Sequence, residues 1–121
     1  MPTLYDVWEL APSWREWWRF TPGELPANFH LRLKGITGRL NSRPFRGQPA
    51  GMCLLTGGAI KFDIEGDGSK ITQVFYDFRL YSTPCPFDIY GEDDFTDLCI
   101  PQGARVAEIG VIGASKGDSG C

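Results

Sequence analysis

The sequence contains few of the residues on which enzymes, metal sites and membrane spans depend. Among its 121 residues there is one histidine, His30, so only one side chain has an ordinary pKa close to neutrality. No apolar run approaches the roughly 20 residues that a membrane-spanning helix needs. Asp6 and Glu9 lie near the N-terminus, where a signal peptide would carry basic residues and then a continuous apolar core. We therefore expect synthesis in a cytoplasm, without a signal peptide.

Cysteine is scarce as well, and it is widely scattered. The four residues are Cys53, Cys85, Cys99 and Cys121, and none has a close neighbour of the kind that zinc sites use. We therefore expect no bound metal and no cofactor. Reduced, buried thiols are favoured over two disulfides because nothing indicates secretion, although the even number leaves pairing open.

One short motif near the C-terminal end has a chemical association. Gly117, Asp118, Ser119 and Gly120 resemble the segment around the nucleophile of chymotrypsin-like serine proteases. That mechanism requires a histidine base oriented by an acid, whereas His30 is expected on the outer face of a strand. Because no set of residues supplies a nucleophile, a base and an orienting group, the sequence predicts a protein that is not an enzyme.

The composition is that of a single soluble domain. Hydrophobic residues make up 42% of the chain and charged residues 22%, and the length is sufficient for a core that needs no disulfide or metal. With 15 glycines and 9 prolines, the composition favours strands joined by long loops.

All four tryptophans lie near the N-terminus, at Trp8, Trp14, Trp17 and Trp18. The last three follow the i, i+3, i+4 spacing of one helical face, and Ser13 followed by Glu16 forms a capping box. The sequence therefore predicts a short helix over residues 12–20. A helix of about two turns is not stable alone, so its tryptophan face should dock on the body or on another molecule.

Several later segments alternate with the period of two that is typical of strands. One strand is predicted from residue 29, followed by a loop over residues 41–50 and a final strand around residues 105–112. The clearest β-hairpin covers residues 60–80, with its turn at residues 66–69. The side chains expected in its core are Ile60, Phe62, Ile64, Val74, Tyr76, Phe78 and Leu80.

Together these segments predict an all-β fold, a small antiparallel β-sandwich or barrel. Residues 1–28 would form an N-terminal arm that carries the short tryptophan-rich helix. Residues 29–121 would form the β domain, and both parts would belong to one globular unit.

Charge is distributed unevenly along the chain. Residues 1–50 hold seven basic and four acidic residues, and the remainder holds five basic and eleven acidic residues. This asymmetry suits contact with copies of the same chain or with a larger protein assembly, and the net charge of −3 disfavours nucleic acid. Besides the four tryptophans, the expected interface comprises Arg32, Lys34, Arg39, Arg43, Arg46, Glu92, Asp93, Asp94 and Asp97.

These features favour a binding or structural protein. Our first expectation is a viral accessory protein of a phage virion, such as a capsid decoration or a head or tail component, made in the host cytoplasm and then incorporated into the virion. The acidic loop also permits a small phage-encoded inhibitor of a host defence nuclease. The tryptophans permit a carbohydrate-binding module. The first of these expectations rests on analogy of architecture.

Overall fold

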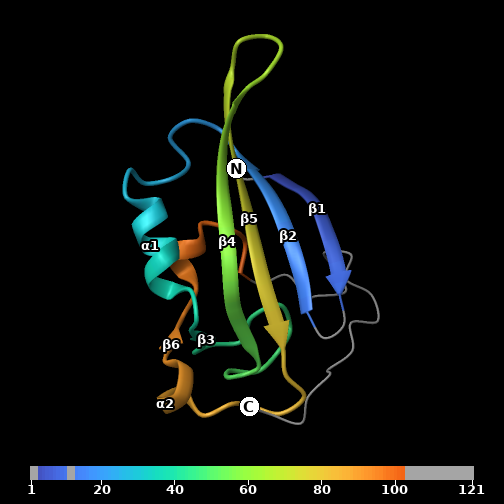
Figure 1. Cartoon of the computed structure of the whole chain (residues 1–121), viewed down its shortest axis with the longest axis vertical. Coiled ribbons are helices and arrows are strands. Elements are labelled where there is room, and N and C mark those ends of the chain that lie inside the picture. The colour runs from blue at the N-terminus through green and yellow to red at the C-terminus, as the bar shows by residue number, and fades with distance from the viewer. Residues whose placement is uncertain (1–2, 11–12, 103–121) are drawn as a thin grey trace.

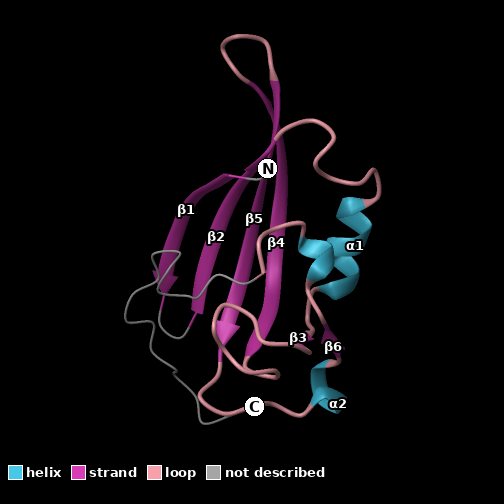
Figure 2. Ribbon diagram, turned by 180° about the vertical axis from the view of Figure 1, so that it is seen from behind, coloured by secondary structure: helices cyan, strands magenta, loops and turns pink. Residues whose placement is uncertain are grey.

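A computed structural model describes residues 3–10 and 13–102 and shows one mixed six-stranded sheet with the order β1-β2-β5-β4-β3-β6 (Figures 1 and 2). Neighbouring strands are antiparallel except β3 and β6, which are parallel. In chain order the elements are β1 (Thr3–Leu10), β2 (Ser13–Phe20), α1 (Phe29–Ile36), β3 (Leu40–Asn41), β4 (Cys53–Ile64), β5 (Lys70–Leu80), α2 (Phe87–Tyr90), β6 (Glu92–Asp93) and the 3-10 helix η1 (Thr96–Leu98).

The strand-rich character predicted from the sequence is confirmed, but a sandwich or barrel is not. All the described strands belong to one sheet. One face of this sheet packs against α1 and the segment around η1, as seen from both sides in Figures 1 and 2. The core therefore lies between a sheet and a covering layer of helix and loop.

The predicted tryptophan helix is wrong, because residues 13–20 form strand β2. Trp14, Glu16, Trp18 and Phe20 are buried on one face of the sheet. The strand pairs with β5 along its whole length and with β1 on its other side. Alternation with a period of two thus determines the structure, and β1 and β2 lie within the sheet instead of on an arm outside it.

The strand predicted from residue 29 is also wrong, because residues 29–36 form helix α1. Phe29, Leu33 and Ile36 are buried at helical spacing, whereas Leu31 is 62% exposed. At the start of the helix, the backbone N–H of Phe29 donates to the carbonyl of Pro26 at 3.0 Å. After its end comes Gly38, whose φ of 88° is favourable for glycine. The apolar residues of this segment fit the period of a strand as well as that of a helix, and packing against the sheet favours the helix.

The hairpin predicted over residues 60–80 is confirmed in its pairing and partly in its core. β4 and β5 form an antiparallel pair with one register shift, between Leu55 and Gly57. The four predicted core residues of β5, from Val74 to Leu80, are buried. Phe62 and Ile64 of β4 are instead 83% and 66% exposed. The hairpin extends past the ends of β1 and β2 (Figure 1), and none of the described helices or strands covers its outer part.

We expect amide hydrogen exchange to separate the two parts of this hairpin. Residues 72–79 of β5 pair with both β2 and β4, so their amides should exchange slowest, because exposing them requires the whole sheet to open. Amides in the turn at residues 66–69 should exchange fastest. Exchange followed by NMR measures this order, and uniformly fast exchange across residues 60–80 would rule out the pairing.

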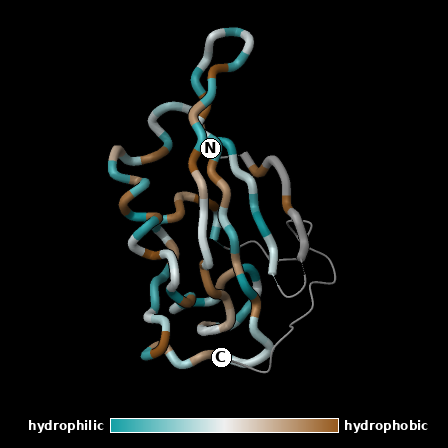
Figure 3. Tube along the Cα trace, viewed as in Figure 1, coloured by the Kyte–Doolittle hydropathy of each residue, from teal (hydrophilic) through white to brown (hydrophobic). Residues whose placement is uncertain are grey.

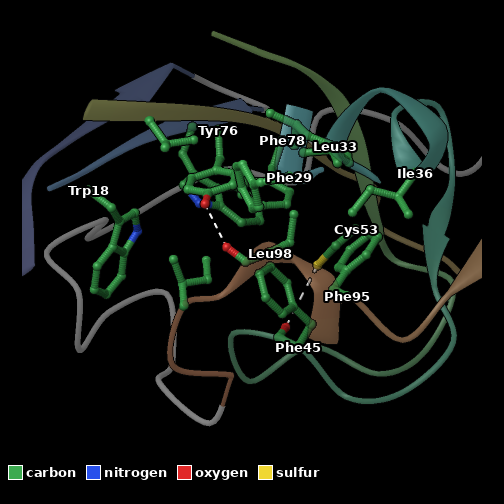
Figure 4. Close-up of a cluster of buried hydrophobic side chains, with 14 of the residues drawn as sticks. Trp18, Phe29, Leu33, Ile36, Phe45, Cys53, Tyr76, Phe78, Phe95 and Leu98 are labelled. Atoms are coloured by element: carbon green, nitrogen blue, oxygen red, sulfur yellow. Dashed lines mark hydrogen bonds between the residues drawn. The ribbon is translucent and has the colours of Figure 1, made fainter. Parts of the chain in front are cut away.

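Aromatic side chains dominate the core (Figure 4). Phe78 lies at its centre, with ring centroids 5.0 Å from Trp14 and 5.1 Å from Phe45. The hydroxyl of Tyr76 donates to the carbonyl of Leu98 at 2.6 Å. Burial raises the pKa of Tyr76, so its phenol stays protonated and keeps this hydrogen bond at neutral pH.

The cysteines do not all behave as expected. Cys53 and Cys99 are free thiols, and burial raises the pKa of Cys99. Cys85 is disulfide-bonded, so the preference for reduced thiols is wrong at this position. The loop predicted over residues 41–50 is confirmed apart from Asn41, which ends β3. The strand expected around residues 105–112 lies outside the described residues.

Candidate functional site

The predicted tryptophan interface is divided by the sheet. Trp14 and Trp18 are 1% and 4% exposed and belong to the core. Trp17 lies on the opposite face, half-buried, with its ring centroid 5.4 Å from that of Phe75. Trp8 pairs with Arg15 in the β1–β2 ladder, and its side chain lies outside the described part of the structure. The shared tryptophan face is therefore not formed.

The two buried tryptophans, Trp14 and Trp18, belong to a hydrogen-bond network centred on Glu16. The indole N–H groups of Trp14 and Trp18 donate to the two oxygens of its carboxylate, each at 2.8 Å. Arg46 donates to the same carboxylate from Nε at 2.9 Å and from Nη2 at 2.8 Å. The side chains of Glu16 and Arg46 are both 0% exposed. Four donors on one carboxylate offset the cost of burying its charge.

Arg46 reaches this network from a tight turn over residues 45–48. The first and last residues of the turn exchange two backbone hydrogen bonds, of 2.9 and 3.0 Å. Arg46 and Gly47 have φ values of 53° and 78°, as in a type I′ turn. The left-handed conformation is uncommon for arginine. Arg46 also donates to the carbonyl of Pro101, so it links its own turn and the segment at Pro101 to Glu16 of β2. This is a structural role and not the predicted interface role.

The predicted basic and acidic groups meet within one chain. Arg32 forms an ion pair with Asp97 at 3.0 Å, and Nη1 of Arg39 donates to the carbonyl of Glu92 at 3.2 Å. The parallel pairing of β3 with β6 brings Arg39 to Glu92, and the contact of α1 with η1 brings Arg32 to Asp97. Contacts that we expected between subunits are thus made inside the molecule.

Of the remaining predicted interface residues, the acidic ones make contacts within their own loop and Lys34 is exposed. Hydrogen bonds from Thr96 lower the pKa of Asp94, and the positive charge of Arg43 acts in the same direction. The carboxylate of Asp93 accepts a hydrogen bond from the backbone N–H of Phe95 at 2.9 Å. Lys34 is exposed on α1, beside a groove described below. The acidic loop therefore stabilises its own conformation.

The two most exposed large apolar side chains in the described residues are Phe62 and Ile64. They lie at the end of the β4–β5 hairpin, and we call this pair the tip. A hollow of about 540 Å³ lies between the tip and Pro22. Figure 3 shows hydrophobic positions on the projecting hairpin next to its hydrophilic turn. Sequence reasoning missed this surface because it assigned the same alternation to the core.

The tip is held in an ordered conformation. The ladder between β4 and β5 continues to Ile64 and Lys70, the residues on either side of the turn, and the N–H of Glu65 donates to the carbonyl of Ser69 at 2.8 Å. The carboxylate of Asp67 accepts from the N–H and hydroxyl of Ser69 at 2.9 and 2.6 Å. Those bonds lower the pKa of Asp67, so the turn remains capped at neutral pH.

The described residues contain neither a cluster suited to a metal ion nor a membrane-spanning helix. In residues 3–10 and 13–102, no group of three or more His, Cys, Asp or Glu side chains could hold a metal ion. The same part of the chain has no helix long and apolar enough to cross a membrane. His30 is exposed on α1. The arrangement at the tip can bury apolar area against another surface.

No protein-family model matches the chain, and neither the curated proteins nor the solved structures contain a significant match.

Proposed function

We propose that this chain is a non-enzymatic protein-binding component of a larger assembly and that it docks through the tip. The observation that carries the proposal is the exposure of Phe62 and Ile64, 83% and 66%, on a hairpin that extends beyond the sheet (Figure 1). Burying apolar surface contributes roughly 25 cal/mol per Å². Aromatic anchors that fill a pocket on a partner are typical of the residues that dominate binding energy.

The order of the tip supports the same proposal. Because the ladder and the Asp67 turn fix the backbone, docking would lose little conformational entropy. A flexible apolar loop would lose more. A rigid apolar projection on a small body suits attachment to a repeated protein lattice, so a capsid decoration or a head or tail component of a phage virion is our narrower proposal.

The two alternative functions have less support from the geometry. A carbohydrate platform would need accessible tryptophans, and Trp14 and Trp18 are buried. A nuclease inhibitor would need free carboxylates, and in the acidic loop Asp97 pairs with Arg32 while Asp94 accepts from Thr96. We therefore keep both only as outcomes of the binding experiment.

Changing Phe62 and Ile64 together to serine should abolish docking and leave the fold intact. Exposed substitutions change stability by at most about 0.5 kcal/mol each, whereas loss of an anchor costs about 2 kcal/mol or more, roughly thirtyfold in affinity. Binding to undecorated capsids by co-sedimentation, beside light scattering and thermal unfolding of the free protein, measures both effects.

The matched control changes Leu31 and Ile89 to serine, since these side chains are 62% and 60% exposed on the two helices. This variant should bind like the wild type. Equal loss of binding in both variants would show that general surface hydrophobicity is responsible. A monomer that binds no virion component and inhibits a purified defence nuclease would replace the proposal with the inhibitor function.

A further inference from the structure

Strand β4 leaves much of one backbone edge without a strand partner. β3 meets it near its start, where Leu40 pairs with Leu54 and the N–H of Leu55 donates to the carbonyl of Arg39 at 3.1 Å. From Thr56 onwards, β5 is its one strand neighbour among the described residues. Such an edge presents N–H and C=O groups that can pair with an added strand.

The register shows which backbone groups face this edge. The N–H of Glu65 donates to the carbonyl of Ser69, so the backbone of Glu65 faces the partner strand. Along an antiparallel ladder, residues whose backbone groups face the partner alternate with residues whose backbone groups face away. The register is unbroken from Ile64 back to Gly57, so the alternation can be followed along β4 from Glu65. The backbone groups of Gly58, Ile60 and Phe62 then face away from β5. Their spacing of two residues is the spacing at which an incoming strand bonds.

Helix α1 forms a second wall beside this edge. A groove of about 420 Å³ lies between the helix and β4, with Leu33 and Lys34 on the helix side. Both views place α1 beside β4 on the side away from β5 (Figures 1 and 2). The groove thus combines an open strand edge with an adjacent helix.

The floor of the groove is nearly bare backbone, formed by Gly57, Gly58 and Ala59. A Cβ atom at Gly58 would lie 2.7 Å from the carbonyl oxygen of Phe75 and 3.2 Å from Cδ2 of Leu33. That contact excludes larger residues at position 58. At Gly57, Gly58 and Ala59, β4 therefore carries no side chain larger than a methyl group.

The charge of the groove has one sign. Among the described residues that line it, Lys34 and His30 are the ionisable ones, and none is a carboxylate. Arg32, on the same helix, is paired with Asp97, whereas Lys34 has no ion-pair partner in the part of the chain that the structure describes. A ligand that carries carboxylates would complement this wall.

We infer that the groove binds an extended acidic peptide segment of a partner protein, which adds to β4 as a further strand. Main-chain bonds to Gly58, Ile60 and Phe62 would supply affinity, and a carboxylate near Lys34 would supply selectivity. The edge and the tip share Phe62, which would bond here through its backbone and dock there through its side chain, and the inference does not depend on the docking function proposed above.

A second copy of this chain fits the edge less well. Twofold antiparallel pairing of β4 with its copy would bring both α1 helices to the same face above one seam, because twofold axes in such a pair run perpendicular to the sheet. The Lys34 side chains of both copies would then face the same groove. Like charges at that distance oppose association, whereas a single acidic strand meets neither obstacle.

The test uses two capped peptides of equal length, one of alternating valine and glutamate and one of alternating valine and lysine. The glutamate peptide should bind the full chain at least about tenfold more tightly, as measured by fluorescence anisotropy. Lys34→Glu should abolish or reverse this preference. Lys70→Glu, the same charge change at the exposed hairpin end, should leave it intact.

Hydrogen exchange locates the bound peptide. Amides of Gly58, Ile60 and Phe62 should gain protection on addition of the glutamate peptide, while those of Ala59 and Lys61, already bonded to β5, should change little. Ile64→Ser, which changes the tip at a residue outside the three bonding positions, should bind the peptide normally and so separates this surface from the tip. Equal affinity for both peptides, or binding without protection at the edge, overturns the inference. Protection that appears without peptide as protein concentration rises would assign the edge to a second copy instead.

Discussion

Replacing Arg46 by methionine should lower the free energy of unfolding by about 3 to 5 kcal/mol, the range observed when one partner of a buried ion pair is removed. The carboxylate of Glu16 would remain in the core and lose both bonds from the guanidinium. The turn at residues 45–48 would also lose the contacts that hold Arg46 in a left-handed conformation. Urea unfolding followed by circular dichroism measures the loss.

A second variant distinguishes the buried charge from the lost packing. Glu16→Gln combined with Arg46→Met removes both charges and keeps an acceptor for an indole N–H. This double variant should recover much of the stability that the single change loses, because no unpaired charge is then buried. A single variant that loses less than about 1 kcal/mol, or a double variant that is less stable than the single one, would contradict a structural ion pair.

Trp18→Ala should also be strongly destabilising, by about 3 to 5 kcal/mol, the cost of a large-to-small change in a core. Trp18 is 4% exposed, and its indole N–H donates to Glu16. Trp17→Ala should cost less, about 1 to 2 kcal/mol, because Trp17 is half-buried on the opposite face of the sheet. Thermal and chemical unfolding of the two variants under the same conditions measures the difference.

This comparison also tests the strand itself. On a helix, residues 17 and 18 would share a face with residue 14, and their removal would cost similar amounts. In strand β2 they point to opposite faces. Equal losses for Trp17→Ala and Trp18→Ala would contradict the position of β2 in the sheet.

The misassignment of residues 13–20 shows a physical limit of local patterns. Trp14 and Trp18 are compatible with a helical face and with one face of a strand. The choice depended on Glu16, whose charge suggested a capping residue on the surface. Its partner Arg46 lies 30 residues away in the sequence, and no local pattern reveals a pair at that separation. Only the folded arrangement makes a buried carboxylate acceptable.

Helix α1 shows the same ambiguity in the opposite direction. Phe29, Leu31 and Leu33 alternate as strand residues do, yet Ile36 completes a helical face with Phe29 and Leu33. The segment is short, so both periods fit about equally. The sheet supplies the apolar surface that favours the helical face, and tertiary packing overrides the local alternation.

The hairpin was the part of the fold best predicted from sequence, and it also contains the site that sequence reasoning missed. Alternation correctly placed Phe62 and Ile64 on the same face as Val74 and Tyr76. Whether that face is buried depends on how far the neighbouring strands extend, and β2 pairs with β5 only as far as Phe20 and Thr72. Beyond this point the core face becomes an exposed surface. The tip could therefore be recognised only in the structure.

The most direct test of docking through the tip is site-specific photo-cross-linking in cells that produce the natural assembly. A photoreactive phenylalanine analogue replaces Phe62 in one variant and Leu31, also exposed, in the control. Docking through the tip requires a cross-link from position 62 to one defined protein of the assembly, and none to that protein from position 31. If the chain still sediments with the assembly but position 62 gives no cross-link, or both positions give the same products, the tip is not the docking element.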